Sequence, residues 1–209
     1  MSLAEYLSFI VTCIIIESTP GPNMAYLAVL SASEGRKAGF FAVLGIALGL
    51  LIVGVLAALG LAALISSSEL AYQLLRWGGI AYLLWLAWDG WKEEPETSPH
   101  KIDGRQQRQK FFKRGLLVNL LNPKAAVFYI AILPGFVNLS NSVTLQTIAL
   151  TVTFVAIATF IHLFIVGMAG TAQEFLQDRK RRLMVRRILS LALGVIAIWF
   201  GFETARNTE

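Results

Sequence analysis

Two short groups of polar residues interrupt long apolar stretches of the chain, and both contain helix-breaking prolines. The first is the run Glu17-Ser18-Thr19-Pro20-Gly21-Pro22-Asn23; the second contains Asn119 and the run Asn122-Pro123-Lys124. A carboxylate, an ammonium group, amides and freed backbone groups suit a ligand that carries both charges. Together they predict a binding site for a zwitterion such as an amino acid.

Each end of such a ligand has expected partners. A half-helix that starts near Asn23 directs free N–H groups and the positive end of its dipole at the site, so these groups and Lys124 are expected to bind the carboxylate. Glu17 and the amide carbonyl of Asn119 or Asn122 are expected to bind the ammonium group. The predicted substrate-binding residues are Glu17, Thr19, Pro20, Gly21, Pro22, Asn23, Asn119, Asn122, Pro123 and Lys124.

Proton coupling is predicted for Glu17 and His162, where substrate and proton compete for the Glu17 carboxylate. The alternatives are a structural ion pair between Glu17 and Lys124, a proline kink that only shapes packing, and a His162 that is only hydrogen-bonded packing. Since an ionisable side chain at a helix centre costs about 2.5–3.5 kcal/mol, neither Glu17 nor Lys124 is expected to face lipid.

The composition identifies the environment of these groups as a lipid bilayer. Of 209 residues, 56% are hydrophobic and only 15% are charged, and the mean hydropathy is +0.64. A soluble domain carries about a quarter charged residues. The net charge of +5 lies in short blocks between apolar runs, so no nucleic-acid partner is expected.

Six apolar segments are long enough to cross a bilayer as helices, because about 20 residues are needed. They are Leu3–Leu30, Ala38–Ile65, Leu70–Trp91, Phe112–Val137, Thr144–Gly170 and Leu183–Ala205. Pro20 and Asn122 lie roughly 16 Å and roughly 15 Å along the helix axis from the predicted inner end of their spans. The first and fourth spans are therefore expected to break at similar depth, near the middle of the membrane.

The fold class expected is all-α, a single transmembrane domain of two inverted three-helix repeats. Residues 1–91 form the first half, 92–111 a hydrophilic cytoplasmic linker and 112–209 the second half. An odd number of spans in each half gives the halves opposite orientations, and paired broken helices are typical of a transport site in such a repeat.

Basic residues predict the orientation. Of the 18 lysines and arginines, all except Arg76, Lys124 and Arg206 lie in the first, third and fifth connecting segments or beside them. Cytoplasmic loops carry such an excess. We expect a multi-pass protein of the cytoplasmic (inner) membrane, with loops 1, 3 and 5 cytoplasmic and both termini outside.

In several sequence features the chain resembles the LysE/RhtB-type amino-acid exporter family. The shared features are the run Thr19-Pro20-Gly21-Pro22-Asn23, the glycines at 35, 39, 45 and 49, the stretch 76–83 and the stretch Gly115 to Lys124. The resemblance implies outward transport of amino acids or close derivatives, driven by the proton gradient. It carries over Pro20, Gly21, Pro22, Asn122, Pro123 and Lys124 as motif positions; the proton role of Glu17 rests on the physical argument alone.

Other classes fit less well. An intramembrane metalloprotease needs a motif such as HExxH, whereas the chain has only His100 and His162, so we expect no enzyme. No cofactor and no resident metal is expected. A carrier of another small solute or of a metal ion on a similar six-helix scaffold remains the alternative. The glycine series in the second span predicts close helix packing, either within the chain or in a homo-oligomer.

Overall fold

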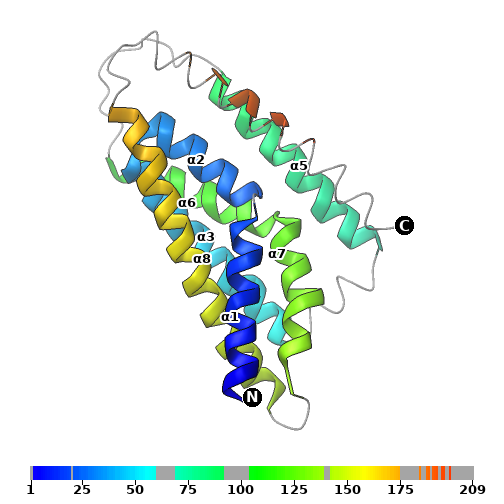
Figure 1. The fold of residues 1–209 in the computed structure, drawn as a ribbon. Helices are drawn as coiled ribbons and strands as arrows, with labels where there is room; N and C mark the ends of the chain where they lie inside the picture. Colours follow the sequence, from blue (N-terminus) through cyan, green and yellow to red (C-terminus); the bar gives the residue numbers. More distant parts are fainter. Residues whose placement is uncertain are drawn as a thin grey trace.

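The computed structural model describes residues 2–19, 21–59, 69–91, 104–138 and 142–174, with a few more residues between 184 and 198. All regular elements within these residues are helical (Figure 1), which confirms the all-α class. Two helices are each long and apolar enough to cross a membrane, and two bent pairs qualify when each is counted as one span, which gives up to four. The six-span repeat stays a prediction, and its sixth span lies mostly outside the described residues.

The first predicted span consists of two helices, α1 (Leu3–Ser18) and α2 (Pro22–Glu34), at an angle of 55°. A reciprocal hydrogen-bond pair between Ser2 and Glu5 caps α1 at its start. Pro22 occupies the first position of α2, where the missing N–H of proline costs no helical hydrogen bond. Gly35, at φ 90°, separates α2 from α3 (Arg36–Ala58), and a residue with a side chain is strained in that conformation.

The fourth predicted span is also broken. It comprises α6 (Gly104–Leu120) and α7 (Pro123–Val127), followed by a π-helical turn (Phe128–Ile132) and a 3₁₀ turn (Leu133–Phe136). The two arms meet at 52°. The helix α6 starts at Gly104, inside the segment predicted as linker, because the arginines, glutamines and lysine from 105 to 110 are good helix formers.

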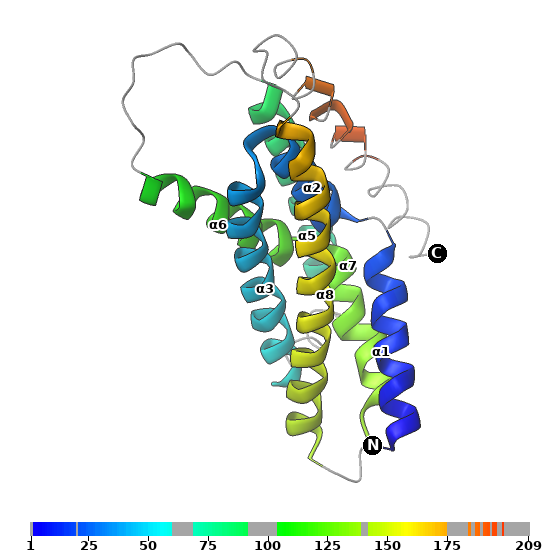
Figure 2. The same ribbon diagram turned by 60° about the vertical axis from the view of Figure 1, so that its left-hand side comes forward.

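Two further long helices, α5 (Glu69–Trp91) and α8 (Val143–Glu174), correspond to the third and fifth predicted spans. The helix α8 packs along α1, α2 and α3. Two views show α1 beside the arm that begins with α7 (Figure 1, Figure 2). The Phe9 ring of α1 lies 6.2 Å from that of Phe128 and 5.1 Å from that of Phe136, in the two turns that follow α7.

The glycines of α3 bring that helix into backbone contact with α6. A Cβ atom on Gly45 would overlap the carbonyl oxygen of Phe112, and one on Gly115 would overlap that of Ala42. A Cβ atom on Gly39 would overlap Ser31 and Val166. The described glycines of α3 therefore pack against helices of the same chain. This shows that the close packing predicted for the glycine series occurs within the chain.

The described basic residues at the starts of α3 and α6 lie at one end of the bundle. The Arg108 guanidinium, near the start of α6, lies 5.8 Å from the ring centre of Phe41 in α3. The Arg36 side chain, at the start of α3, contacts Gly170 near the end of α8. The starts of α3 and α6 and the end of α8 thus share the end of the bundle opposite the start of α1.

Candidate functional site

The two helix breaks meet at one small cavity. Its volume is about 10 Å³, roughly the space that one water molecule needs. Residues from both breaks, and one from α3, line it: Glu17, Gly21, Asn23, Met24, Leu50, Asn122, Lys124 and Ala125. Residues about a hundred positions apart in sequence therefore line the same cavity.

The first break leaves backbone donors open. Gly21 precedes α2 and has no side chain to accept a hydrogen bond from the first turn, and no side-chain cap is present there. The first backbone N–H groups of a helix have no carbonyl partner within it. Because Gly21, Asn23 and Met24 all line the cavity, the positive end of α2 lies at its wall.

The second break is capped. The Asn122 side-chain oxygen accepts a hydrogen bond of 3.0 Å from the backbone N–H of Lys124, and Pro123 begins α7. Asparagine followed by proline is a favourable start for a helix, because the amide satisfies a free N–H and the proline needs none. The Asn122 amide therefore has a structural function as well as a place in the cavity wall.

Lys124 spans the gap between the breaks. Its ammonium nitrogen donates a hydrogen bond of 2.7 Å to the carbonyl oxygen of Thr19, at the C-terminal end of α1. A cation is favourable there because the last carbonyls of a helix carry a partial negative charge. The Lys124 stem passes over Gly21, where an added Cβ atom would lie 3.1 Å from Lys124 Cδ.

Glu17 contacts histidine instead of lysine. Its Oε2 lies 3.5 Å from Nε2 of His162 in α8, and the two residues are only 7% and 1% exposed. In this conformation Glu17 and Lys124 line the same cavity, but each has a different nearest partner. A hydrogen bond between them needs a proton on one of the two facing atoms, Glu17 Oε2 or His162 Nε2, and a neutral histidine can carry its proton on Nε2.

A buried amide pair joins the two broken spans. Asn23 Nδ2 donates a hydrogen bond of 2.9 Å to Asn119 Oδ1, and both side chains are buried. The other two polar atoms of the pair, Asn23 Oδ1 and Asn119 Nδ2, have no hydrogen-bond partner within the described residues. Unsatisfied buried groups are costly, so the pair offers an acceptor and a donor to a polar ligand or a water molecule.

Most of the predicted site residues are thus brought together. Thr19 contributes its carbonyl, since its hydroxyl donates to the carbonyl of Ile15. Asn119 meets Asn23 instead of lining the cavity, and Pro20 lies outside the described residues. Sequence reasoning missed Leu50, which lines the cavity and whose carbonyl accepts a 2.9 Å hydrogen bond from the Tyr129 hydroxyl. The π-helical turn that contains Tyr129 has no signal in the sequence that we recognise.

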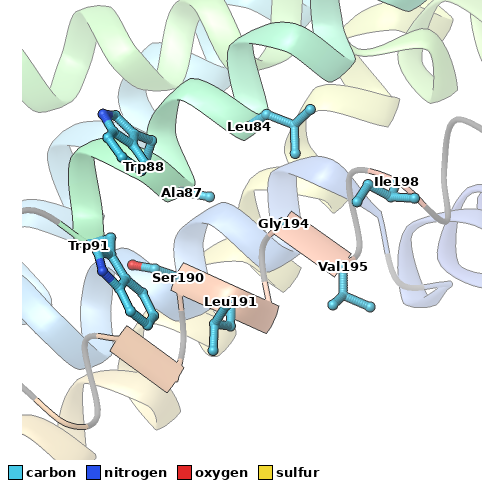
Figure 3. A pocket seen from close by; sticks show the side chains of 9 residues that line it. All are labelled: Leu84, Ala87, Trp88, Trp91, Ser190, Leu191, Gly194, Val195 and Ile198. Atoms are coloured by element: carbon cyan, nitrogen blue, oxygen red, sulfur yellow. The ribbon is translucent and has the colours of Figure 1, made fainter.

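A larger groove elsewhere in the structure is apolar. The apolar groove between α5 and residues 190–198 has a volume of about 400 Å³ (Figure 3). Trp88, Trp91 and Leu191 are among its lining residues, and no ionisable side chain is. Within the described residues, no group of three histidine, cysteine, aspartate or glutamate side chains is close enough to hold a metal ion.

Comparisons with known proteins agree on one family. The family described as LysE type translocator matches residues 14–208. A homoserine/homoserine lactone efflux protein of Salmonella typhimurium is 31% identical over 157 residues, which cover 75% of this chain and 76% of the relative. A leucine efflux protein of an Enterobacter species is 26% identical over 97% of this chain and 94% of its own. An uncharacterized membrane protein of Bacillus subtilis, YrhP, is 29% identical over 97% and 98%. No solved structure matches significantly.

Proposed function

We propose that this chain, which belongs to the LysE type translocator family, exports amino acids or close derivatives through the cytoplasmic membrane. Membership of this family confirms the resemblance found in the sequence. It also makes the chain a transporter and not an enzyme. The efflux proteins for homoserine and leucine among its relatives support amino-acid export. The pathway runs outward from the basic end of the bundle, which faces the cytoplasm, and exchanges substrate for protons.

The observation that carries this proposal is the meeting of two broken spans at one cavity with opposite charges in its wall. Glu17 supplies a carboxylate, Lys124 an ammonium group and the first turn of α2 its open N–H groups. These groups complement the two charges that every amino acid carries. Breaks of 55° and 52° in corresponding spans also support the inverted repeat.

The cavity must enlarge before it binds a substrate. At about 10 Å³ it holds one water molecule and no amino acid, so a substrate does not fit in this conformation. The substrate carboxylate replaces the Thr19 carbonyl as the partner of Lys124, and the substrate ammonium approaches Glu17. Opening of the site toward one side of the membrane and then toward the other gives alternating access.

Proton exchange follows from competition at Glu17. Deprotonated, Glu17 holds the substrate ammonium; protonated, it releases that cation to the outside. His162, 3.5 Å from the carboxylate, is the group to which Glu17 passes its proton. Both residues are deeply buried, so the exchange requires the opening that admits the substrate.

Transport into inside-out membrane vesicles tests this proposal. We expect vesicles with the wild-type chain to accumulate labelled leucine or homoserine when a proton gradient is imposed, and to stop when an uncoupler is added. Glu17→Gln should reach the membrane at normal levels but lose gradient-driven accumulation. Glu5→Gln is the matched control, because Glu5 is on the same helix but exposed.

Two results would contradict the proposal. Accumulation that never exceeds the outside concentration would indicate a passive channel. Normal gradient-driven accumulation by Glu17→Gln would show that another group carries the proton.

A further inference from the structure

A second polar cavity lies along α2, between the helix break and the basic end of the bundle. Its volume is about 50 Å³, space for about four water molecules. On α2 its lining extends from Tyr26 to Glu34, whereas Asn23 and Met24, immediately before, line the cavity at the break. The two cavities therefore follow one another along a single helix, over roughly 16 Å from Asn23 to Glu34.

The wall of this second cavity has the same charge complement as the first. Glu34 supplies a carboxylate from the last turn of α2, and Lys110 and Arg114 supply cations from α6. Lys110 and Arg114 are four residues apart, so their side chains share one face of that helix. The Arg114 guanidinium lies 5.3 Å from the centre of the Trp85 ring, which holds it at the cavity by a cation–π contact.

A buried hydroxyl in the same wall lacks a partner. Ser190 is 2% exposed, and its Oγ makes no hydrogen bond within the described residues. The residue lines both the polar cavity and the apolar groove of Figure 3. Because a buried polar group is normally satisfied, a polar ligand or water molecule in the cavity is a candidate partner for this hydroxyl.

We propose that this cavity is a first binding site for the amino-acid substrate, on the cytoplasmic side of the site at the breaks. Lys110 and Arg114 bind the substrate carboxylate, Glu34 binds its ammonium group and Ser190 adds a neutral hydrogen bond. The substrate side chain extends toward the apolar groove beyond Ser190. The proposal depends on the export function and orientation proposed above and adds where recognition begins.

Kinetics in inside-out vesicles test it, because the cytoplasmic face is then outside and the substrate concentration can be varied there. The probes are labelled leucine and labelled homoserine. Glu34→Gln and Lys110→Gln should each raise KM about fivefold, the upper range for solvent-accessible charge pairs, and leave the maximal rate unchanged. A variant of the site at the breaks, Lys124→Gln, should lower the maximal rate instead.

Lys113→Gln is the matched control. Lys113 is exposed on the same helix, three residues from Lys110, and lines a separate groove with Phe112 and Leu116. A KM unchanged in Glu34→Gln and Lys110→Gln would overturn the proposal, and so would an equal rise in Lys113→Gln, which would indicate general surface charge. The maximal rate can also be compared in vesicles with and without anionic lipid. If it depends on anionic lipid in the wild type but not in Lys110→Gln, the cavity binds a lipid headgroup and the proposal is wrong.

The two proposals fail separately. If wild-type vesicles accumulate neither probe, export of these amino acids is wrong. If wild-type vesicles accumulate them and both cavity variants keep the wild-type KM, only the first binding site is wrong.

Discussion

The two breaks have almost the same angle, 55° and 52°, but they end their helices differently. At the second break, the Asn122 side chain caps α7 and backbone contact with α3 holds α6 in place. At the first break, Gly21 leaves the start of α2 uncapped. At the second break the Lys124 N–H is therefore satisfied and α6 is held against α3, whereas the first break keeps donors open toward the cavity. In the proposed alternating-access cycle, we expect the second break to stay fixed and the first break to bind the substrate.

The largest effect is expected from Lys124, the side chain that joins the two breaks. Lys124→Gln removes a charge-assisted hydrogen bond to the Thr19 carbonyl and the only cation in the cavity wall of the described residues. Interactions of this kind contribute about 1.5–3 kcal/mol, so export should fall about 10- to 100-fold. Initial export rates, normalised to the amount of protein in the membrane, measure this.

Lys124→Arg is the control for charge. It keeps the cation but adds bulk to a cavity of about 10 Å³, so export should recover only partly. Near-normal export by Lys124→Gln would show that the lysine only braces the structure.

A second prediction concerns the rigidity of the second break. Gly115→Val should destabilise the protein by about 1–3 kcal/mol, because its side chain would overlap the Ala42 carbonyl in the backbone of α3. Thermal unfolding of the purified protein in detergent measures the change. Gly135→Ala is the control, since an added Cβ atom there has no neighbour within 4 Å. Equal unfolding temperatures for both variants would refute the idea of a fixed second break.

A third prediction makes the first break resemble the second. Gly21→Ser supplies a capping hydroxyl for the open N–H groups of α2, and the extended backbone at Gly21, with φ −158° and ψ 178°, accepts a side chain. The added Cβ atom would lie 3.1 Å from Lys124 Cδ, so the flexible lysine stem must shift slightly. If those N–H groups bind substrate, export should fall about tenfold, equivalent to about 1.4 kcal/mol, while the unfolding temperature does not fall. Export and thermal stability measured on the same preparation separate binding from folding. Unchanged export would show that the α2 terminus takes no part in binding.

The sequence predicts the positions of the breaks better than the contacts between them. Proline at the first turn of a helix, and asparagine before it, act locally, so the breaks near Pro22 and Asn122 are readable from the chain. The contact of Glu17 with His162 is not, because it depends on how α8 packs against α1 after the bend. The start of α6 at Gly104 was missed because the prediction followed hydropathy, and a charged helix gives no apolar signal.

The smallest effect is expected from uncapping the second break. Asn122→Ala removes the hydrogen bond from the Lys124 N–H to the Asn122 side chain and should lower stability by about 1 kcal/mol. Asn122→Asp keeps an acceptor and should restore most of that stability.

If the amide serves only as a cap, the aspartate variant should also restore export, because the start of α7 again has its partner. If Asn122 binds substrate as well, the aspartate variant should be stable and still impaired, because a second carboxylate in the cavity repels the substrate carboxylate. Unfolding temperature and export rate, compared across the three proteins, decide whether the capped break is a support or also a binding surface.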